Sequence, residues 1–291
     1  MRVLMLLAAA LVFSPLHAAQ IRDDRGRVFD LPHPSTRIIV LSPHLAELVF
    51  AAGAGAQLAA VVSYSDYPQA AAALPTVGDA ARIDLERVIA LKPDLILGWR
   101  SGNPVSEVQR LEQRGFAVFM TEPRRLADIP RVLRAIGALA ETSAVAQAAA
   151  ARVDDELALL RARYMKREPV RVFYEIWHYP LLTINNEHLI SDIITLCGGI
   201  NVFAAAPVLT PSVSLEAVLA ARPEVVLGGS SASTAHALKA QWQGARVQAL
   251  RSLPVLHVPP DLIQRQTPRV VEGARQVCEH LEKVRGDLRK R

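Results

Sequence analysis

Apolar residues recur at helical spacing along one long stretch of the chain, from Ser143 to about Lys166. Charged residues fall between the apolar positions, which are Val153, Leu157, Leu160 and Tyr164. The stretch contains neither glycine nor proline. This pattern predicts one long amphipathic helix. At about 1.5 Å per residue it would span about 36 Å, enough to cross a whole lobe or to brace two.

Two segments on either side of this helix carry nearly the same pattern. Segments 85–98 and 215–228 are related by a constant offset (216 − 86 = 130), and nearly every position is identical or a like-for-like substitution. Each predicts a polar helix N-cap (Asp84 or Ser214), a short helix ended by proline, and an apolar strand closed by glycine. This internal repeat predicts two similar lobes joined by the long helix.

Predicted strands and helices alternate along the rest of the chain. Strands are predicted over 26–29, 37–42, 58–63, 117–120, 170–176 and 255–258, and helices over 45–52, 129–140, 189–196 and 269–288. The alternation indicates an α/β fold of two similar lobes, each a mostly parallel sheet covered by helices, joined by one long rigid interlobe helix. The expected boundaries are 20–141 for the N-terminal lobe, 142–167 for the helix and 168–291 for the C-terminal lobe.

Residues 1–19 have the pattern of a cleaved secretory signal peptide. Arg2 precedes an apolar core from Val3 to Phe13, and small residues end at Ala18 and Ala19. The core is too short to span a membrane, and no cysteine follows it, which argues against a lipid anchor. We therefore expect an exported, soluble protein.

The chain is basic, with a formal net charge of +5 at pH 7, which falls to +4 when Arg2 leaves with the signal peptide. Its lysines and arginines are scattered, without a basic stripe interleaved with aromatic residues. This distribution is typical of a solvated surface and predicts no nucleic-acid partner.

The sequence lacks the common signatures of enzymes. The segment from Gly53 to Leu58 begins like a dinucleotide-binding loop, but it follows a predicted helix and ends in leucine. No P-loop, G-x-S-x-G or H-E-x-x-H motif occurs, and the eight histidines are dispersed. We therefore expect no catalytic residues, bound metal or cofactor, although residues that meet only in space escape such a search.

Aromatic and polar residues gather at the ends of predicted strands, where α/β sheets place ligands. They occupy Ser63–Pro68, Trp99–Asn103 and Trp177–Pro180, with Asp261 and Arg265 near the C-terminus. Each alone is explained by packing, because large aromatic side chains are usually mostly buried. Together they predict a cleft between the lobes for a large, flat, partly apolar ligand.

The chain has two cysteines, Cys197 and Cys278, both after the long helix. In an exported protein an even number suggests a disulfide, and two buried free thiols are the alternative. A bridge between them would be internal to the second lobe.

Several of these segments resemble a known family. The longest shared motif is L-S-P-x-x-x-E-L-x-F-A-A-G, from Leu41 to Gly53, and the others are 63–68, 85–95, 99–103, 197–199, 213–216 and 261–269. In these the chain resembles the periplasmic vitamin B12 (cobalamin)-binding proteins of bacterial ABC importers, a class of helix-hinged receptors for corrinoids, haem and ferric siderophores. The resemblance implies a periplasmic receptor, monomeric when free, that holds cobalamin or a close corrinoid in the interlobe cleft and delivers it to a permease dimer.

The resemblance also implies roles for particular residues. The positions that match the family's ligand contacts are Tyr64 and Trp99 against the corrin ring, Asp261 and Arg265 on the opposite face, and the backbone around Ser42 and Pro43 on the floor. It further implies that Cys197 and Cys278 form the disulfide.

Glu86 and Glu216 match the carboxylates that dock into arginine pockets of the permease in this family. Two equivalent carboxylates also suit a two-fold symmetric partner. The alternative is that each only complements the dipole of its own helix, worth about 0.3 to 1 kcal/mol.

The chain departs from the family pattern at aromatic positions. Ala80 and Thr210 stand where tryptophans are expected, and Ile176 stands for a phenylalanine, although the adjacent Trp177 is expected to substitute for it. These departures leave a haem or ferric-siderophore receptor of the same fold open as an alternative.

His44 belongs to the expected floor of the cleft. It could approach a metal in the ligand, but contact with polar ligand groups or solvent is the preferred interpretation. Together with His178 and Tyr179 it keeps a haem ligand open. A periplasmic enzyme that uses His178 or Asp66 is a further alternative, which lacks a recognisable nucleophile.

Overall fold

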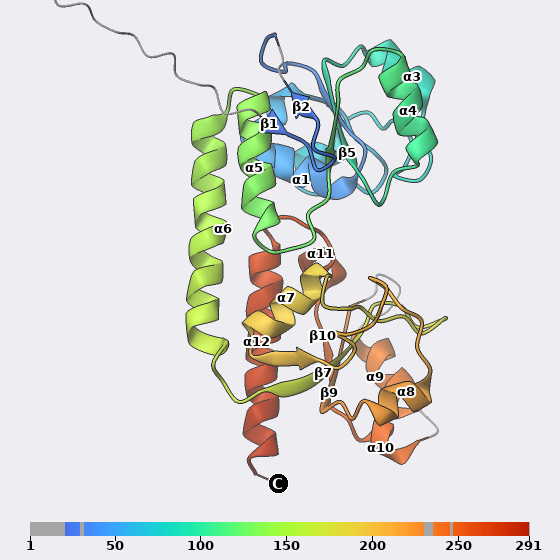
Figure 1. Ribbon diagram of the computed structural model, residues 1–291, viewed down its shortest axis with the longest axis vertical. Coiled ribbons are helices and arrows are strands. Elements are labelled where there is room, and N and C mark those ends of the chain that lie inside the picture. The colour runs from blue at the N-terminus through green and yellow to red at the C-terminus, as the bar shows by residue number, and fades with distance from the viewer. Residues whose placement is uncertain (1–20, 30–31, 230–234, 245–246, 291) are drawn as a thin grey trace, which may run out of the picture.

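The computed structural model describes residues 21–29, 32–229, 235–244 and 247–290. They form two lobes, one above the other, with α6 (Ser143–Tyr164) running along one side of both (Figure 1). The predicted signal peptide, residues 1–19, lies outside the described residues. Among the described residues, no helix is both long and apolar enough to cross a membrane.

The elements before α6 form the first lobe. They are β1 (Ile21–Arg22), β2 (Val28–Phe29), β3 (Ile38–Val40), α1 (Pro43–Ala51), the 3-10 helix η1 (Gly55–Gln57), β4 (Leu58–Ala60), α2 (Gln69–Ala72), α3 (Leu85–Leu91), β5 (Leu95–Trp99), α4 (Val105–Gln113), β6 (Val118–Thr121) and α5 (Asp128–Leu139).

The elements after α6 form the second lobe. They are β7 (Val170–Glu175), α7 (Leu189–Leu196), β8 (Gly199–Asn201), α8 (Leu215–Ala220), β9 (Val225–Gly228), α9 (Ala235–Gln243), α10 (Gln248–Arg251), β10 (Val255–His257), α11 (Pro260–Ile263) and α12 (Val270–Leu288).

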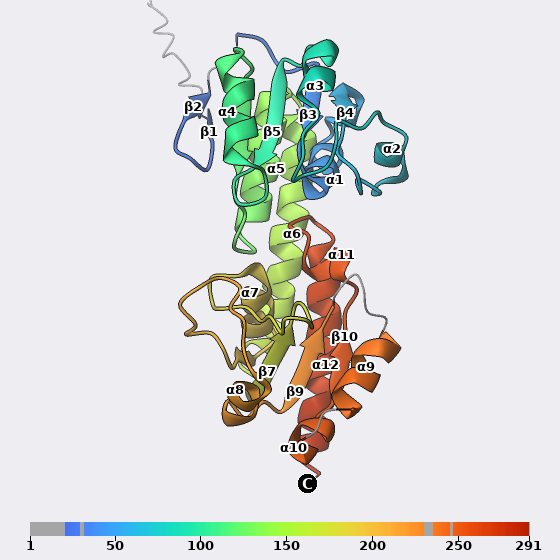
Figure 2. The ribbon, with the colours of Figure 1, turned by 90° about the vertical axis from the view of Figure 1, so that its right-hand side faces the viewer.

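Each lobe is built on a four-stranded parallel sheet. The strand order is β4-β3-β5-β6 in the first lobe and β10-β9-β7-β8 in the second. Parallel neighbours need crossover connections, and the helices that supply them lie around each sheet (Figure 2). The β1–β2 pair is antiparallel and stands apart from both sheets. The predicted α/β fold with two similar lobes is confirmed.

The repeat unit adopts the predicted helix–strand form in both lobes. It consists of α3 and β5 in the first lobe and of α8 and β9 in the second. The Asp84 side chain caps α3 by accepting a hydrogen bond from the amide of Arg87, and Ser214 caps α8 by accepting one from Ala217. Both predicted N-caps are therefore confirmed.

The two copies of the repeat are also anchored in the same way to their sheets. Arg37, just before β3, donates its side chain to the Leu91 carbonyl at the end of α3. Arg171, at the start of β7, donates in the same way to the Ala221 carbonyl at the end of α8. A carboxylate of each repeat, Asp94 or Glu224, accepts a hydrogen bond from the amide of the same arginine. α3 and α8 are thus fixed in equivalent positions, which the sequence comparison did not reveal.

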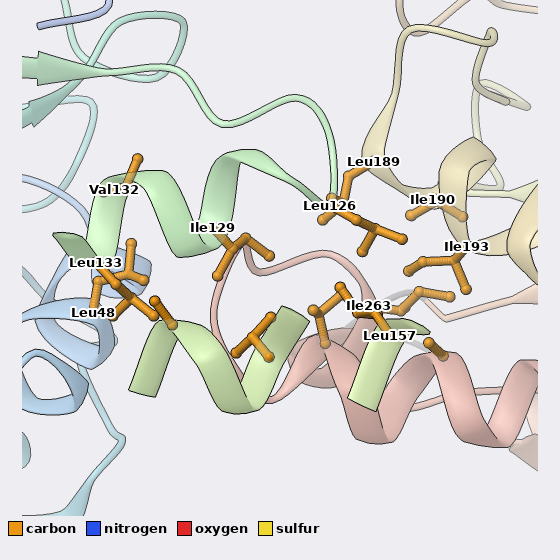
Figure 3. Packing of buried hydrophobic residues seen from close by; sticks show 14 of the residues in the cluster. Leu48, Leu126, Ile129, Val132, Leu133, Leu157, Leu189, Ile190, Ile193 and Ile263 are labelled. Carbon is orange, nitrogen blue, oxygen red and sulfur yellow. The ribbon is translucent and has the colours of Figure 1, made fainter. Parts of the chain in front are cut away.

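α6 carries one continuous hydrophobic core through both lobes. Its buried residues are Ala146, Ala149, Ala150, Val153, Leu157, Leu160 and Tyr164. They belong to a single cluster that extends from Phe29 in the first lobe to Val284 in α12. Figure 3 shows Leu126 of the first lobe next to Leu189 of the second, with Ile193 close by. The apolar contact between the lobes is therefore continuous with the hydrophobic core of each lobe.

A disulfide joins Cys197, at the end of α7, to Cys278 in α12, with an S–S distance of 2.01 Å. The predicted pairing is confirmed, and the alternative of two free thiols is wrong. The bridge lies within the second lobe and spans 81 positions of sequence. It ties the terminal helix to the helix that packs between that sheet and the first lobe.

Some local predictions differ from the structure. α1 begins at Pro43, two residues earlier than predicted, because the fixed φ of proline suits the first position of a helix. The strand predicted over 26–29 is only one half of the short β1–β2 pair. The elements that were not predicted are β1, η1, α2, α4, β8, α9, α10 and α11.

Leu157 and Leu159 form a matched pair on α6, because Leu157 is 4% exposed and Leu159 is 68% exposed. We expect Leu157→Ala to lower the free energy of unfolding by about 2 to 5 kcal/mol, through lost burial and the cavity left behind. Leu159→Ala should change it by no more than about 0.5 kcal/mol. Urea unfolding of both variants measures this, and equal effects would contradict the burial of this face of α6.

Candidate functional site

The carboxyl ends of the two parallel sheets face each other at the junction between the lobes. Glu47 lies in α1, directly after β3, and Asp66 lies in the loop after β4, whereas Arg265 follows α11 in the second lobe. The Arg265 guanidinium reaches both carboxylates, with N–O distances of 3.1 Å to Glu47 and 2.6 Å to Asp66. Accordingly, α11 lies directly beside the first lobe in Figure 1. Parallel sheets place ligands at this end of their strands.

Glu47 is a buried carboxylate that joins the lobes. It accepts hydrogen bonds from Arg269 at 2.6 and 2.8 Å and from Arg265 at 3.1 Å. Because Glu47 is only 3% exposed, two guanidinium groups are needed to offset the cost of burying its charge. Arg269 also lies over the Tyr67 ring, 4.2 Å from its centroid. Sequence reasoning did not select Glu47 as functional, although a charged residue inside the apolar helix 45–52 was the available signal.

Arg265 and Asp261, both predicted to contact the ligand, contact each other. The Nε atom of Arg265 lies 3.0 Å from the Asp261 carboxylate, one helical turn earlier. The hydrogen bond from Arg265 also holds the pKa of Asp66 below its usual value. The Asp66 side chain is 60% exposed, and that of Glu47 is 2% exposed. Asp66 is therefore the partner that a ligand can displace from Arg265 at lower cost.

Ser42 and His44 are buried at the junction, beside Trp99. Nδ1 of His44 lies 2.8 Å from the Ser42 hydroxyl, and the imidazole meets the Trp99 ring edge to face, with 5.3 Å between centroids. Burial and the charge of Arg265 lower the pKa of His44 to about 3, so the ring is neutral at physiological pH. The preferred interpretation had His44 touching polar ligand groups or solvent; at 3% exposure the contact with solvent is wrong, and the contact with a ligand stays a prediction. Its Nε2 has no hydrogen-bond partner among the described residues.

Trp99, the last residue of β5, is held in place by its own loop. Its amide donates to the Asn103 side chain at 2.7 Å, and the Asn103 amide group donates to the carbonyls of Leu41 and Ala80. A Cβ atom at Gly102 would lie only 1.8 Å from the Trp99 ring, so glycine is required there. The half-buried indole is thus held against His44 by its own loop.

Four aromatic side chains are exposed in the described part of the chain, and all of them lie on two loops. Tyr64 is 80% exposed and Tyr67 is 47% exposed in the loop that follows β4. Trp177 is 44% exposed and Tyr179 is 89% exposed in the loop that follows β7. Each lobe thus presents one aromatic loop at the carboxyl end of its sheet. Tyr64 also has a φ of 67°, a left-handed conformation that a bulky residue rarely adopts.

The loop after β7 is supported by a buried carboxylate. Glu175 accepts hydrogen bonds from Trp242 at 2.6 Å and from Gln241 at 2.8 Å. Within the loop, the Trp177 indole donates to the Tyr179 carbonyl at 2.9 Å. Ile176 packs against the hydrophobic core, so Trp177 is the member of that pair that remains available to a ligand.

The two other departures from the family pattern lie in different surroundings. Ala80 is half-buried, and its carbonyl accepts a hydrogen bond from Asn103 beside Trp99. Thr210 is exposed in the loop before α8. In the part of the chain that the structure describes, no group of three or more His, Cys, Asp or Glu residues could hold a metal ion.

Glu86 and Glu216 do not belong to the junction. Both are exposed, on α3 and α8, and Figures 1 and 2 place these helices on the same side of the molecule, one on each lobe and opposite α6. Hydrogen bonds from its own backbone amide and from Ser214 hold the pKa of Glu216 below its usual value. The structure thus separates the predicted site residues into a junction set and an outer pair.

Residues 38–262 match a family model described as periplasmic binding protein, which covers well over half of the chain. The chain belongs to the periplasmic binding protein family. Among its curated relatives, a vitamin B12-binding protein of Vibrio cholerae is 36% identical over 251 residues, which cover 86% of this chain and 91% of the relative. A vitamin B12-binding protein of Vibrio parahaemolyticus is 37% identical over 252 residues, or 87% and 91% of the two chains.

Solved structures of periplasmic binding proteins agree with this assignment. The crystal structure of the periplasmic vitamin B12-binding protein of Vibrio cholerae superposes with a TM-score of 0.79 at 36% identity, over 87% of this chain and 99% of that one. A periplasmic haem-binding protein from Roseiflexus superposes with a TM-score of 0.75 at 23% identity, over 86% and 99%. At that identity the second likeness shows the fold alone.

Replacing Glu47 tests whether the buried charge holds the lobes of this periplasmic binding protein together. Glu47→Gln leaves the Arg265 and Arg269 guanidinium groups without their shared carboxylate, so we expect it to lower the free energy of unfolding by about 3 kcal/mol. Glu156→Gln is the control, because the Glu156–Arg275 pair is exposed and such pairs contribute about 0 to 1 kcal/mol. Urea unfolding measures the free energy of unfolding of both variants. Equal decreases in the two would refute the role of Glu47.

The low pKa of His44 predicts a pH dependence. Its folded pKa of about 3 lies below the ordinary value of 6.5, so the unfolded chain binds the proton first. Native stability should therefore fall as the pH drops from about 6.5 to about 3, by up to about 1.4 kcal/mol per pH unit. His188, whose pKa burial lowers to about 4, contributes to the same window.

His44→Gln should make this slope smaller without abolishing it, because His188 remains. Urea unfolding at several pH values measures the slope, with His33→Gln at an exposed position as the control. A slope in His44→Gln as steep as in the unmodified protein would contradict the burial of a neutral imidazole.

Proposed function

We propose that this protein is a periplasmic receptor that binds cobalamin, or a close corrinoid, between its lobes and delivers it to the permease of an ABC importer. The observation that carries the proposal is the pair of exposed aromatic loops, one at the carboxyl end of each sheet. The vitamin B12-binding relatives, which match nearly the whole chain, support the same ligand.

A corrin ring is large and flat, with apolar faces and a rim of amide side chains. Tyr64, Trp99 and Trp177 supply the flat apolar surface that such faces require. Asp261 and Arg265 supply charged partners for the amides, once the ligand takes the place of the exposed Asp66 beside Arg265. The backbone around Ser42 and Pro43 forms the floor, and His44 supports Trp99 from below.

The lobes of this receptor are expected to move little relative to each other. Separating them would expose the apolar core that α6 carries through both. It would also break ion pairs at two places, between Glu47 and Arg269 and between Arg125 and Asp192, where the N–O distance is 2.6 Å. Release of the ligand therefore requires the permease to force the lobes apart.

In this proposal the signal peptide of residues 1–19 directs export to the periplasm, and the receptor is a monomer when it is not bound to the permease. The Cys197–Cys278 disulfide is consistent with an oxidising compartment. The corrinoid is transported cargo, and the proposal assigns no cofactor, metal or catalytic residue to the protein.

Glu86 and Glu216 are proposed to dock onto the permease. Both carboxylates are exposed on helices that equivalent arginine anchors hold in equivalent positions. A two-fold symmetric dimer can bind two such lobes through the same patch on each subunit.

Haem is the second candidate ligand. Tyr179 is 89% exposed and the side chain of His178 is 53% exposed at the end of β7, where either residue could supply an axial ligand to iron. A ferric catecholate is less favoured, because it needs free basic residues, whereas Arg265 and Arg269 are already paired with carboxylates.

Calorimetric titration of the mature protein with cyanocobalamin, haemin and a ferric catecholate tests the ligand. We expect one-to-one binding of cyanocobalamin, weakened at least about tenfold in Tyr64→Ala and in Trp99→Ala by loss of the aromatic surface. Leu159→Ala, on the exposed face of α6, should bind as the unmodified protein does. Binding of haemin alone, with a Soret shift that disappears in Tyr179→Ala, would reject the corrinoid in favour of haem.

A further inference from the structure

The exposed faces of α3 and α8 carry similar side chains at equivalent positions. On α3 these are Glu86, Ile89 and Ala90, and at the equivalent positions of α8 they are Glu216, Leu219 and Ala220. All six residues are exposed, whereas the opposite face of each helix is buried through Val88 or Val218. The repeat thus preserves an exposed aliphatic side chain beside the carboxylate, one helical turn further along.

Single exposed aliphatic residues are common on protein surfaces and need no explanation. Ile89 and Leu219 differ in that they recur at equivalent positions, with exposed fractions of 37% and 38%. A helix face turned to solvent is normally polar, yet an aliphatic side chain stands one turn after the glutamate on both helices, although the residue after the glutamate differs, being the exposed Arg87 in α3 and Ala217 in α8. Neither side chain belongs to the hydrophobic core of its lobe, and the recurrence of the exposed part beside an equivalent carboxylate favours a contact outside the lobe.

Both faces are also held rigidly. The arginine anchors, Arg37 and Arg171, fix the carboxyl ends of α3 and α8 to their sheets, and Asp84 and Ser214 cap the amino ends. A surface that is ordered before binding loses little conformational entropy when it docks. α3 and α8 lie on the same side of the molecule, opposite α6 (Figures 1 and 2).

We propose that Ile89 and Leu219 are paired apolar anchors for the permease dimer. Each inserts into an apolar pocket that lies beside the basic group bound by Glu86 or Glu216. This inference rests on the proposed docking of the two carboxylates and extends it to the contact that gives affinity. The partner is two-fold symmetric, because one kind of pocket must fit two equivalent faces. In such interfaces the charged pairs steer association and fix register, whereas buried apolar side chains supply most of the binding energy.

Ile89→Ser and Leu219→Ser, alone and together, test the anchors. The control is Leu159→Ser, which removes a more exposed aliphatic side chain from α6 on the opposite side. Binding of each variant to the permease–ATPase complex of the source organism, reconstituted in lipid nanodiscs, is measured by surface plasmon resonance at low and at high salt. Glu86→Ala/Glu216→Ala is measured in parallel, and every variant is titrated with cyanocobalamin to show that the lobes are intact.

We expect each single serine variant to bind the permease about tenfold more weakly and the double variant more weakly still, with cyanocobalamin affinity and the Leu159→Ser control unchanged. The loss should persist at high salt, whereas the effect of the glutamate variant should shrink, because salt screens exposed charges and leaves apolar contacts in place.

Serine variants that bind the permease normally, while the glutamate variant does not, would overturn the anchors and leave carboxylate docking in place. A loss confined to one of the two lobes would overturn the paired, two-fold arrangement. Normal permease binding by the serine and glutamate variants alike would overturn the anchors together with the docking proposal, whereas the proposed ligand is judged separately by the cyanocobalamin titration.

Discussion

The apolar core that α6 carries through both lobes is the constraint on which the rest of the structure depends. Leu157 and Leu160 are buried together with residues of α7 and α12, and Ala146 is buried together with residues of α5. Since this core is continuous, the two sheets cannot rotate freely, and the carboxyl ends of their strands stay opposed. The opposed loops can then serve as two walls of one site, which neither lobe could form alone.

Glu47 adds direction to this apolar contact. Burial of apolar surface is not directional, but a carboxylate that must accept from both Arg265 and Arg269 fixes how the lobes meet. A buried charge of this kind contributes less to net stability than its short hydrogen bonds suggest, because desolvation opposes them. Its main effect is to fix the position of one lobe relative to the other. The second lobe then contacts the loop that holds Tyr64, Asp66 and Tyr67.

The internal repeat explains why one molecule has two kinds of surface. At the carboxyl ends of the sheets the lobes differ, with Trp99 in one and Trp177 in the other, as the proposed binding of a single asymmetric ligand requires. On the outer side the lobes remain alike, because α3 and α8 are capped and anchored by equivalent residues. A two-fold symmetric partner can bind both lobes in the same way only through the side that carries α3 and α8, where the lobes are equivalent.

The sequence by itself determined the α/β class, the repeat, the N-caps Asp84 and Ser214 and the course of α6, because these follow from local periodicity and capping chemistry. Only the tertiary structure decided that Glu47 pairs with Arg265, 218 positions away, and that His44 is buried and neutral. Such features depend on which groups meet and how much water is excluded around them. The spacing of residues along the chain carries no record of either, so the long-range partners and the shifted pKa appear only once the lobes have packed together.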